Sequence, residues 1–142
     1  MAVHVVVNRA TLDKVPHKRL SHKLVSHGIK GEVLRWLTNC LDRREQRVCI
    51  NGISSGWKRV ISGVPQGSVI GPILFLIYIN NMDLGVDNEI LKFADDTKLY
   101  GIVTNRDEAL SLQKDLNVLI QWTSQWQMKL LCMYSNTNIT ST

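Results

Sequence analysis

Residues 62–103 decide the fold: they read S-G-V-P-Q-G-S-V-I-G-P-I-L-F-L-I-Y-I-N-N-M, a connection of seven residues, and then I-L-K-F-A-D-D-T-K-L-Y-G-I-V. Within them, Asp95-Asp96 lies between residues 89–94 and residues 97–103, two runs in which apolar and polar side chains alternate. This alternation predicts two β-strands joined as a hairpin, with both carboxylates at its tip. Neighbouring side chains on a flat strand point to opposite faces, so two adjacent aspartates can serve one site only where the backbone turns.

The aspartate pair has two interpretations. Two ionised carboxylates about 5 Å apart repel by about 3 kcal/mol at an effective dielectric constant of about 20, and a bound divalent cation would offset that repulsion. The plainer interpretation is favourable turn chemistry, because Asp tolerates positive φ and hydrogen-bonds its own backbone. The dipeptide alone does not decide between them.

A turn-forming loop, residues 63–68, precedes the hairpin and leads into an apolar segment that begins near Gly71-Pro72. Its sequence, G-V-P-Q-G-S, contains a single long amide side chain, that of Gln66. A loop that enters a helix N-terminus offers free backbone N–H groups, which favour phosphate. Taken alone, this segment is equally consistent with an ordinary turn.

Together, in this order and about 25 residues apart, the loop and the hairpin resemble the reverse transcriptases of the non-LTR, LINE-like retrotransposons, particularly the jockey-like group. The resemblance extends from D-K-V-P-H at residues 13–17 to W-Q-M-K at residues 126–129. It implies an α+β fold, in which a polymerase palm-type antiparallel sheet contains a strand at residues 3–7 and a catalytic-type β-hairpin at residues 89–103. Helices are expected to back this sheet.

The same resemblance implies a function and a site. The chain is expected to be an RNA-directed DNA polymerase fragment of a mobile element, acting on an RNA template, a DNA primer and deoxynucleoside triphosphates. Nucleotidyl transfer in this class uses two Mg²⁺ ions, for which Mn²⁺ can substitute. The catalytic and metal-binding residues implied are Asp95 and Asp96. The residues implied to line the nucleotide and template pocket are Gly63, Pro65, Gln66, Gly67, Phe93 and Ala94.

The sequence departs from the family pattern where a third carboxylate is expected. The family's strand motif reads close to D-F-S-K-A-F-D-K-V-P-H, and aligning its end with residues 13–17 puts its metal-binding aspartate at Val7. Valine has no oxygen with which to bind Mg²⁺. Asn81 also stands where the family usually has aspartate, and no thumb segment follows Lys129. We therefore expect an incomplete two-ion site and little or no polymerase activity from this chain alone.

Length and composition bound the remaining possibilities. A chain of 142 residues makes one domain of ordinary size, too short for the fingers, palm and thumb of a complete polymerase. We expect a partial reverse transcriptase domain, the palm with part of the fingers, over residues 1–129, and a divergent, disordered tail over residues 130–142. The longest apolar run, residues 69–79, is too short to span a bilayer and is expected to form a buried core helix.

The cysteines and the N-terminus indicate the compartment. Three cysteines, odd in number and without metal-ligand spacing, favour a reducing environment, so an intracellular location, nuclear or cytoplasmic, is expected. The N-terminus lacks the charged region and cleavage site of a signal peptide. No membrane partner is expected.

Charge is distributed unevenly along the chain. Residues 1–60 hold twelve Lys and Arg against four Asp and Glu, whereas residues 61–142 hold five against eight, within a net charge of +5. This polarity suits a protein that contacts phosphates with one part and metal ions with another. The candidate contacts to a nucleic-acid backbone are Arg43, Arg44, Arg47, Lys58 and Arg59. Solvated surface charge explains this cluster equally well.

Hydrophobic periodicity predicts the remaining elements. Helices are expected over residues 17–27 and 30–41, a hairpin of strands over residues 46–51 and 57–62, and a further helix after the N-cap Asn105. The side chains expected to be buried are Leu20 and Leu24 on the first helix, Val33, Leu34, Leu37 and Leu41 on the second, and Ala109, Leu112, Leu116, Leu119 and Trp126 on the third.

Two other functions are compatible with the sequence. One is a non-enzymatic nucleic-acid-binding remnant of the palm fold, in which removing Asp95 and Asp96 should strengthen nucleic-acid affinity by deleting repulsion. The other is an unrelated metal-dependent nuclease, which needs a third acid near the hairpin, from Asp13, Asp83 or Asp87. The nuclease interpretation leaves the glycine-rich loop unexplained.

Overall fold

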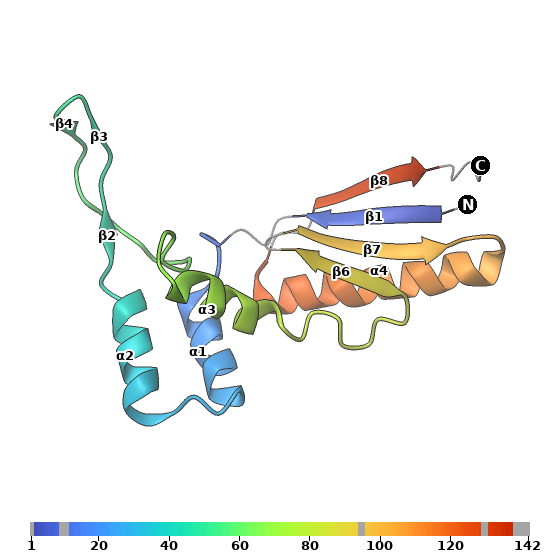
Figure 1. Ribbon diagram of the computed structural model, residues 1–142, viewed down its shortest axis with the longest axis horizontal. Helices are drawn as coiled ribbons and strands as arrows, with labels where there is room; N and C mark the ends of the chain where they lie inside the picture. Colours follow the sequence, from blue (N-terminus) through green and yellow to red (C-terminus); the bar gives the residue numbers. More distant parts are fainter. Residues whose placement is uncertain (1, 9–11, 94–95, 129–130, 138–142) are drawn as a thin grey trace. The chain divides into compact units, whose positions relative to one another are not determined.

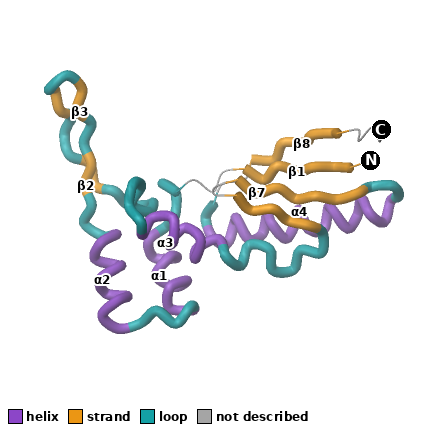
Figure 2. The backbone as a smooth tube through the Cα atoms, in the orientation of Figure 1, coloured by secondary structure: helices purple, strands orange, loops and turns teal. Residues whose placement is uncertain are grey.

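The computed structural model describes residues 2–8, 12–93, 96–128 and 131–137. Its contacts divide the chain into two compact units. We call residues 12–78 the helical unit, and residues 79–142 together with the N-terminal eleven residues the sheet unit. Helices combine with small antiparallel sheets (Figure 2), as expected of an α+β protein.

The sheet unit contains a four-stranded antiparallel sheet in the order β6-β7-β1-β8. Its strands are β1 (Ala2–Asn8), β6 (Glu89–Phe93), β7 (Asp96–Ile102) and β8 (Leu131–Thr137), and helix α4 (Arg106–Trp126) runs along one face of the sheet (Figure 1). The β-branched run in β1 favours a central strand, and β1 indeed lies between β7 and β8.

Strand β8 occupies residues for which the sequence predicts a disordered tail. It pairs with the full length of β1, from Ala2 opposite Thr137 to Asn8 opposite Leu131. Pairing of this kind satisfies backbone N–H and C=O groups that β1 would otherwise expose along an edge. Because the pairing uses the backbone, it leaves no strong pattern of side chains by which the strand can be recognised in advance.

Helix α4 begins and packs largely as predicted. The side chain of Asn105 accepts a hydrogen bond from the backbone N–H of Glu108 at 2.9 Å. In turn, the Glu108 carboxylate accepts a hydrogen bond from the backbone N–H of Thr104 at 2.6 Å. Leu112, Leu116 and Leu119 are buried, as expected. Two expectations for this helix are corrected: Ala109, near its first turn, is exposed, and Trp126 is only half-buried.

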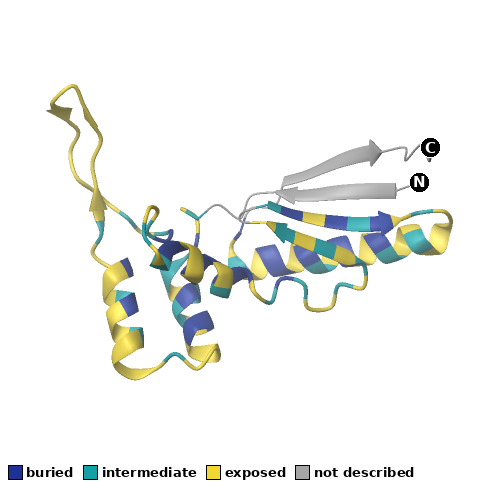
Figure 3. Ribbon diagram, viewed as in Figure 1, coloured by how far each residue is buried: buried dark blue, intermediate teal, exposed yellow. Residues whose placement is uncertain are grey.

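Close packing joins α4 to β7. Buried and exposed residues alternate along β7, as Figure 3 shows, and Leu99 is completely buried. A Cβ atom on Gly101 would lie 2.8 Å from a methyl carbon of Leu112. Glycine at this position therefore allows the helix to approach the strand.

The helical unit is built from α1 (His17–Ser26), α2 (Gly31–Leu41) and most of α3 (Ile70–Ile79). Leu20, Leu24, Leu37 and Leu41 are buried, as predicted. Val33, predicted to be buried with them, is 58% exposed. A sequence pattern identifies an apolar position on a helix, but only the neighbouring elements determine whether that position is covered.

Helix α3 corrects the expectation of a fully buried core helix. Leu74, Phe75 and Tyr78 are buried, at the spacing of one helical face, whereas Ile73 and Leu76 are more than half exposed. The helix is apolar all round, so its periodicity contains no information about which side packs.

A two-stranded arm, residues 45–59, extends from the helical unit, and all its residues are exposed (Figure 3). The two long strands predicted here are instead two short ladders, β2 (Glu45–Gln46) with β5 (Lys58–Arg59) and β3 (Cys49–Ile50) with β4 (Ile53–Ser54). The turn between β3 and β4 is the predicted Asn-Gly, with φ of 50° and 81° as a type I′ turn requires.

Lys23 in α1 is a basic residue that is only 2% exposed. Burial disfavours the charged ammonium and lowers the pKa of Lys23 from 10.5 to about 8. The side chain therefore opposes folding at neutral pH.

We expect the variant Lys23→Met to be more stable than the parent chain below pH 8, by at most about 3 kcal/mol. Between pH 8 and 10.5 the unfolded parent chain binds more protons than the folded one, so its stability should rise with pH. Urea denaturation across this range measures both effects. In Lys23→Met the free energy of unfolding should not rise with pH over this range. In Lys18→Met, at an exposed position of the same helix, it should rise as in the parent chain. An equal dependence of stability on pH in all three chains would contradict the prediction.

Candidate functional site

Asp96 is the first residue of β7 and is half-buried. The sheet register sets it opposite Phe93 of β6 and opposite Asn8 of β1. Phe93 is 83% exposed. Asp95 and Ala94, which the sequence assigns to the same site, lie outside the described residues. The structure therefore brings two of the four hairpin candidates into register.

The backbone register also locates the position of the expected third carboxylate. Val7 pairs with Thr97, one residue from the pair formed by Asn8 and Asp96. The strand that carries Val7 thus runs directly beside the strand that begins at Asp96, as the sequence predicts.

The two metal ions that the resemblance implies need several oxygen ligands held close together. Within the described parts of the chain, no three His, Cys, Asp or Glu residues come together as a metal-binding group. Valine at position 7 contributes no donor atom. The described residues thus do not form a two-ion site.

Asp83 and Asp87 of the sheet unit are each paired with a lysine. The Lys92 ammonium lies 2.8 Å from the Asp83 carboxylate. Burial alone would raise the pKa of Asp83, but its hydrogen bond to Lys92 and its other contacts bring that pKa below its ordinary value. Asp87 forms an exposed ion pair with Lys114 at 2.8 Å.

Asn81, which replaces an aspartate of the family pattern, forms a side-chain hydrogen bond with Trp122. Its side-chain oxygen accepts a hydrogen bond from the Trp122 indole N–H at 3.1 Å. This bond links α4 to the segment that follows α3 within the sheet unit.

The glycine-rich loop of the helical unit is held against residues 12–15. Backbone N–H groups of Gly63 and Val64 donate to the carbonyls of Val15 and Leu12, each at 2.8 Å. The Ser62 hydroxyl donates to the carbonyl of Asp13 at 2.9 Å. Two motifs that are almost 50 residues apart in the sequence are thus paired through their backbones.

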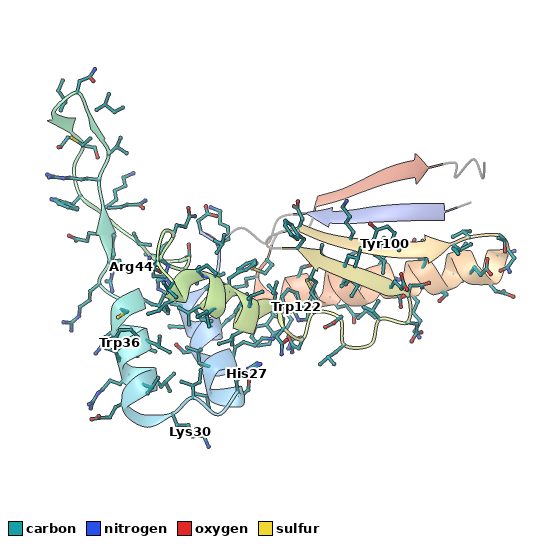
Figure 4. The ribbon with its side chains drawn as sticks, viewed as in Figure 1. His27, Lys30, Trp36, Arg44, Tyr100 and Trp122 are labelled. Atoms are coloured by element: carbon teal, nitrogen blue, oxygen red, sulfur yellow. The ribbon has the colours of Figure 1, made fainter. Side chains whose placement is uncertain are left out.

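The carbonyl of Gly63 accepts two hydrogen bonds from side chains. His17 donates from Nε2 at 2.9 Å, and Arg44 donates from its guanidinium. Burial lowers the pKa of Arg44, and Figure 4 labels this side chain at the base of the arm. Sequence reasoning missed His17, because nothing local indicates a partner 46 positions away.

The tip of the loop leads into α3. Gln66 is exposed and Gly67 has a φ of +77°. The Ser68 hydroxyl donates to the carbonyl of Pro65 at 2.8 Å and accepts from the N–H of Gly71 at 3.1 Å. Ser68 therefore satisfies a backbone donor at the start of the helix, and the Gln66 side chain is left to face solvent.

A polar pocket of about 530 Å³ lies within the helical unit, between the glycine-rich loop, the base of the arm and residues 13–14. Its lining includes Lys14, Arg44, Arg59 and Gln66. Asp13 is the carboxylate in this lining, so the pocket carries a net positive charge.

The remaining basic candidates lie on or beside the arm. The Arg59 guanidinium donates to Asp42 at 2.8 Å, and hydrogen bonds from Arg59 and the backbone of Arg43 lower the pKa of Asp42. The Arg47 guanidinium lies 4.6 Å from the centre of the Trp57 ring. Lys58 is exposed on β5. These four basic side chains are exposed, although Arg59 is ion-paired with Asp42, whereas Arg44 donates to the glycine-rich loop.

No helix in the described ranges is both long and apolar enough to cross a membrane.

The known proteins that match this chain are RNA-directed DNA polymerases of mobile elements. The family described as reverse transcriptase (RNA-dependent DNA polymerase) matches residues 9–131. Among individual relatives, the RNA-directed DNA polymerase from the mobile element jockey of Drosophila melanogaster is 32% identical over 102 residues, which cover 63% of this chain and 11% of the relative. The jockey polymerase of Drosophila funebris is 30% identical over 130 residues, covering 83% of this chain and 14% of the relative.

The probable RNA-directed DNA polymerase from the transposon X-element of Drosophila melanogaster is 28% identical over 134 residues, covering 90% of this chain and 15% of the relative. The chain thus matches only a small part of the length of each of these relatives.

Proposed function

Because the chain belongs to the reverse transcriptase family of mobile elements, we propose that it forms part of the catalytic palm of an RNA-directed DNA polymerase. The family match bears out the resemblance seen in the sequence. The observation that supports the palm assignment is the register of β1 on β7, which sets the position of the family's strand carboxylate beside the strand that begins at Asp96.

In this proposal, β6 and β7 are the two strands of the catalytic-type hairpin. Asp95 and Asp96 are its carboxylates, and they would take part in binding divalent ions such as Mg²⁺ or Mn²⁺. Val7 leaves that ion site without its third acid. The proposed consequence is a palm that retains its backbone arrangement but lacks polymerase activity.

The glycine-rich loop is proposed to bind the incoming nucleotide and the template. Its anchoring to residues 12–15 and to His17 supports this role, because a rigid loop can present Gln66 in one conformation. The proposed partners are an RNA template, a DNA primer and deoxynucleoside triphosphates. The rest of the fingers and the thumb would come from outside the 142 residues.

We expect the variant Val7→Asp to bind Mn²⁺ more tightly than the parent chain does. Restoring the acid supplies the oxygen ligands that a divalent ion needs. Because the thumb and part of the fingers are proposed to lie outside the 142 residues, Mn²⁺ titration rather than primer extension measures the effect of this substitution.

Val7→Asn is the matched control, since it has the shape of aspartate without the charge, and it should bind Mn²⁺ no more tightly than the parent chain. Adding Asp95→Ala to the Val7→Asp variant should abolish the restored Mn²⁺ affinity. Primer extension by the parent chain that Asp95→Ala removes would contradict the proposed loss of activity. A folded Val7→Asp variant with the Mn²⁺ affinity of the parent would contradict the proposed metal site at the hairpin.

The second candidate is a nucleic-acid-binding remnant without catalysis, and the basic arm and net-positive pocket favour it. The two functions differ in their need for the hairpin acids. In a remnant, Asp95→Ala and Asp96→Ala should each strengthen nucleic-acid affinity, because each removes a charge that repels phosphate.

A further inference from the structure

The arm presents an aromatic side chain that the proposed polymerase chemistry does not use. Trp57 is 60% exposed, which is unusual for so large an apolar surface. The Arg47 guanidinium lies over its ring at 4.6 Å from the centre. Since most of the side chain is exposed, the indole has a face available to another planar group.

The strand register indicates which other side chains share that face. Glu45 pairs with Arg59 and Gln46 with Lys58. Extending this register by one residue pairs Arg47 with Trp57, in agreement with their contact. Cross-strand partners and residues two apart lie on one face of a ladder, so Arg47, Trp57 and Arg59 share a face, and Glu45, opposite Arg59, is the acid on it.

This face continues into the polar pocket. Arg59 belongs to both, since it is part of the pocket lining together with Lys14, Gln46 and Gln66. Five Lys and Arg residues against two acids lie within residues 42–59, which gives this segment a net charge of +3. A partner of this surface must therefore be anionic, and it must also offer a planar group to the indole.

Single-stranded nucleic acid meets both requirements. Its phosphates are anionic, and each base has a π-face that stacks on an aromatic side chain, whereas duplex bases are already stacked on one another. Arginine beside the ring adds a cationic contribution to stacking. An acidic protein surface would satisfy the charge but would leave Trp57 without a planar partner.

We propose that the arm binds single-stranded nucleic acid, with one unpaired base stacked on Trp57 and the adjoining phosphates contacted by Arg59 and Lys14 at the pocket. The inference rests on the proposed function, since a reverse transcriptase handles an unpaired template strand. It goes further by assigning that strand to a surface outside the hairpin and by naming an aromatic contact.

The test compares the affinity of the 142-residue chain for a single-stranded RNA 12-mer of mixed sequence and for a blunt duplex of the same sequence, by fluorescence anisotropy. Trp57→Ala should weaken single-strand binding by roughly 5- to 150-fold, the effect of losing one stacked base, and should leave the weaker duplex binding unchanged. Trp36→Ala is the matched control, because Trp36 is exposed to a similar extent on α2, and it should bind as the parent does.

A salt titration tests the phosphate contact separately. Arg59→Ala should reduce the slope of log affinity against log salt by about 0.7 for the single strand. Arg35→Ala, in which an equally exposed arginine is removed from an ion pair with Glu32, should leave the slope unchanged. Retained thermal melting of each variant shows that the arm, which is exposed throughout, has not altered the fold.

Each result decides a different point. Binding by the parent chain that Trp57→Ala does not weaken, or weakens equally for duplex and single strand, overturns the stacking proposal and leaves the polymerase assignment to the Val7→Asp experiment. Failure of the parent chain to bind either nucleic acid overturns the arm proposal and the binding-remnant function together. Binding of a polyglutamate chain with the same loss in Trp57→Ala would assign the arm to an acidic protein instead.

Discussion

Replacing Gly63 with alanine is expected to destabilise the helical unit by about 4 kcal/mol, because two independent costs add at this residue. Its φ of +90° lies in the region that side-chain-bearing residues rarely adopt. A Cβ atom here would also lie 2.6 Å from the Cα and 2.8 Å from the carbonyl oxygen of Asp13. Both neighbours are backbone atoms, which cannot rotate away. Urea denaturation followed by circular dichroism measures the loss.

Two other glycines separate these costs. Gly28 has a φ of +82° but nothing within 4 Å of its added Cβ, so Gly28→Ala should cost only about 1 kcal/mol. Gly56 also has open space and lacks a positive φ, so Gly56→Ala should change stability by less than about 0.5 kcal/mol. If Gly63→Ala costs no more than Gly28→Ala, then the contact with Asp13 yields easily and the loop is not rigidly anchored.

The same substitution bears on function. Moving the Gly63 backbone would displace the carbonyl to which His17 and Arg44 donate. The proposed nucleotide-binding loop and the lining of the pocket would then shift together. A variant that folds yet loses single-strand affinity would link the anchoring of the loop to binding.

Asp115→Asn is expected to destabilise the sheet unit by about 3 kcal/mol. Asp115 is completely buried on α4 and accepts three hydrogen bonds: from the N–H of Asp87 at 3.0 Å, and from the N–H and the side-chain amide of Asn88 at 2.7 Å each. These bonds fix the loop that leads into β6. Asparagine keeps the shape but replaces one acceptor oxygen with an N–H₂ group, which would face a backbone donor.

The same carboxylate predicts a pH dependence. Burial alone would raise the pKa of Asp115, but the hydrogen bonds from Asp87 and Asn88 outweigh it and the pKa lies below its ordinary value of 3.8. A lowered pKa contributes stability that is present above about pH 4 and is lost as pH falls through the folded-state pKa. Asp115→Asn should lack this loss on acidification.

Asp87→Asn is the matched control in the same loop, because it removes an exposed ion pair with Lys114 and should cost less than about 1 kcal/mol. Thermal denaturation of the three chains between pH 3 and 7 provides the comparison. Equal stability of Asp115→Asn and Asp87→Asn would show that the three hydrogen bonds contribute little to the fold.

Local patterns and the order of the motifs are enough to predict several features of this protein. The two motifs around Gln66 and Asp95 were sufficient to identify the family, which the comparisons then confirmed. Helical spacing of Leu20 and Leu24 predicted a buried face, and Asn105 predicted the start of α4. These signals succeed because a helix period, a cap or an Asn-Gly turn depends only on residues a few positions apart.

Contacts between residues far apart in the chain are visible only in the folded protein. Asp115 reads as a polar position on an amphipathic helix, and Lys23 as a solvated cation, yet both are buried. His17 gains its role from a carbonyl 46 positions away, and β8 forms because β1 has a second edge to pair. The physical reason is shared: burial and hydrogen-bond partners depend on which surfaces the folded chain brings together, and no local pattern specifies them.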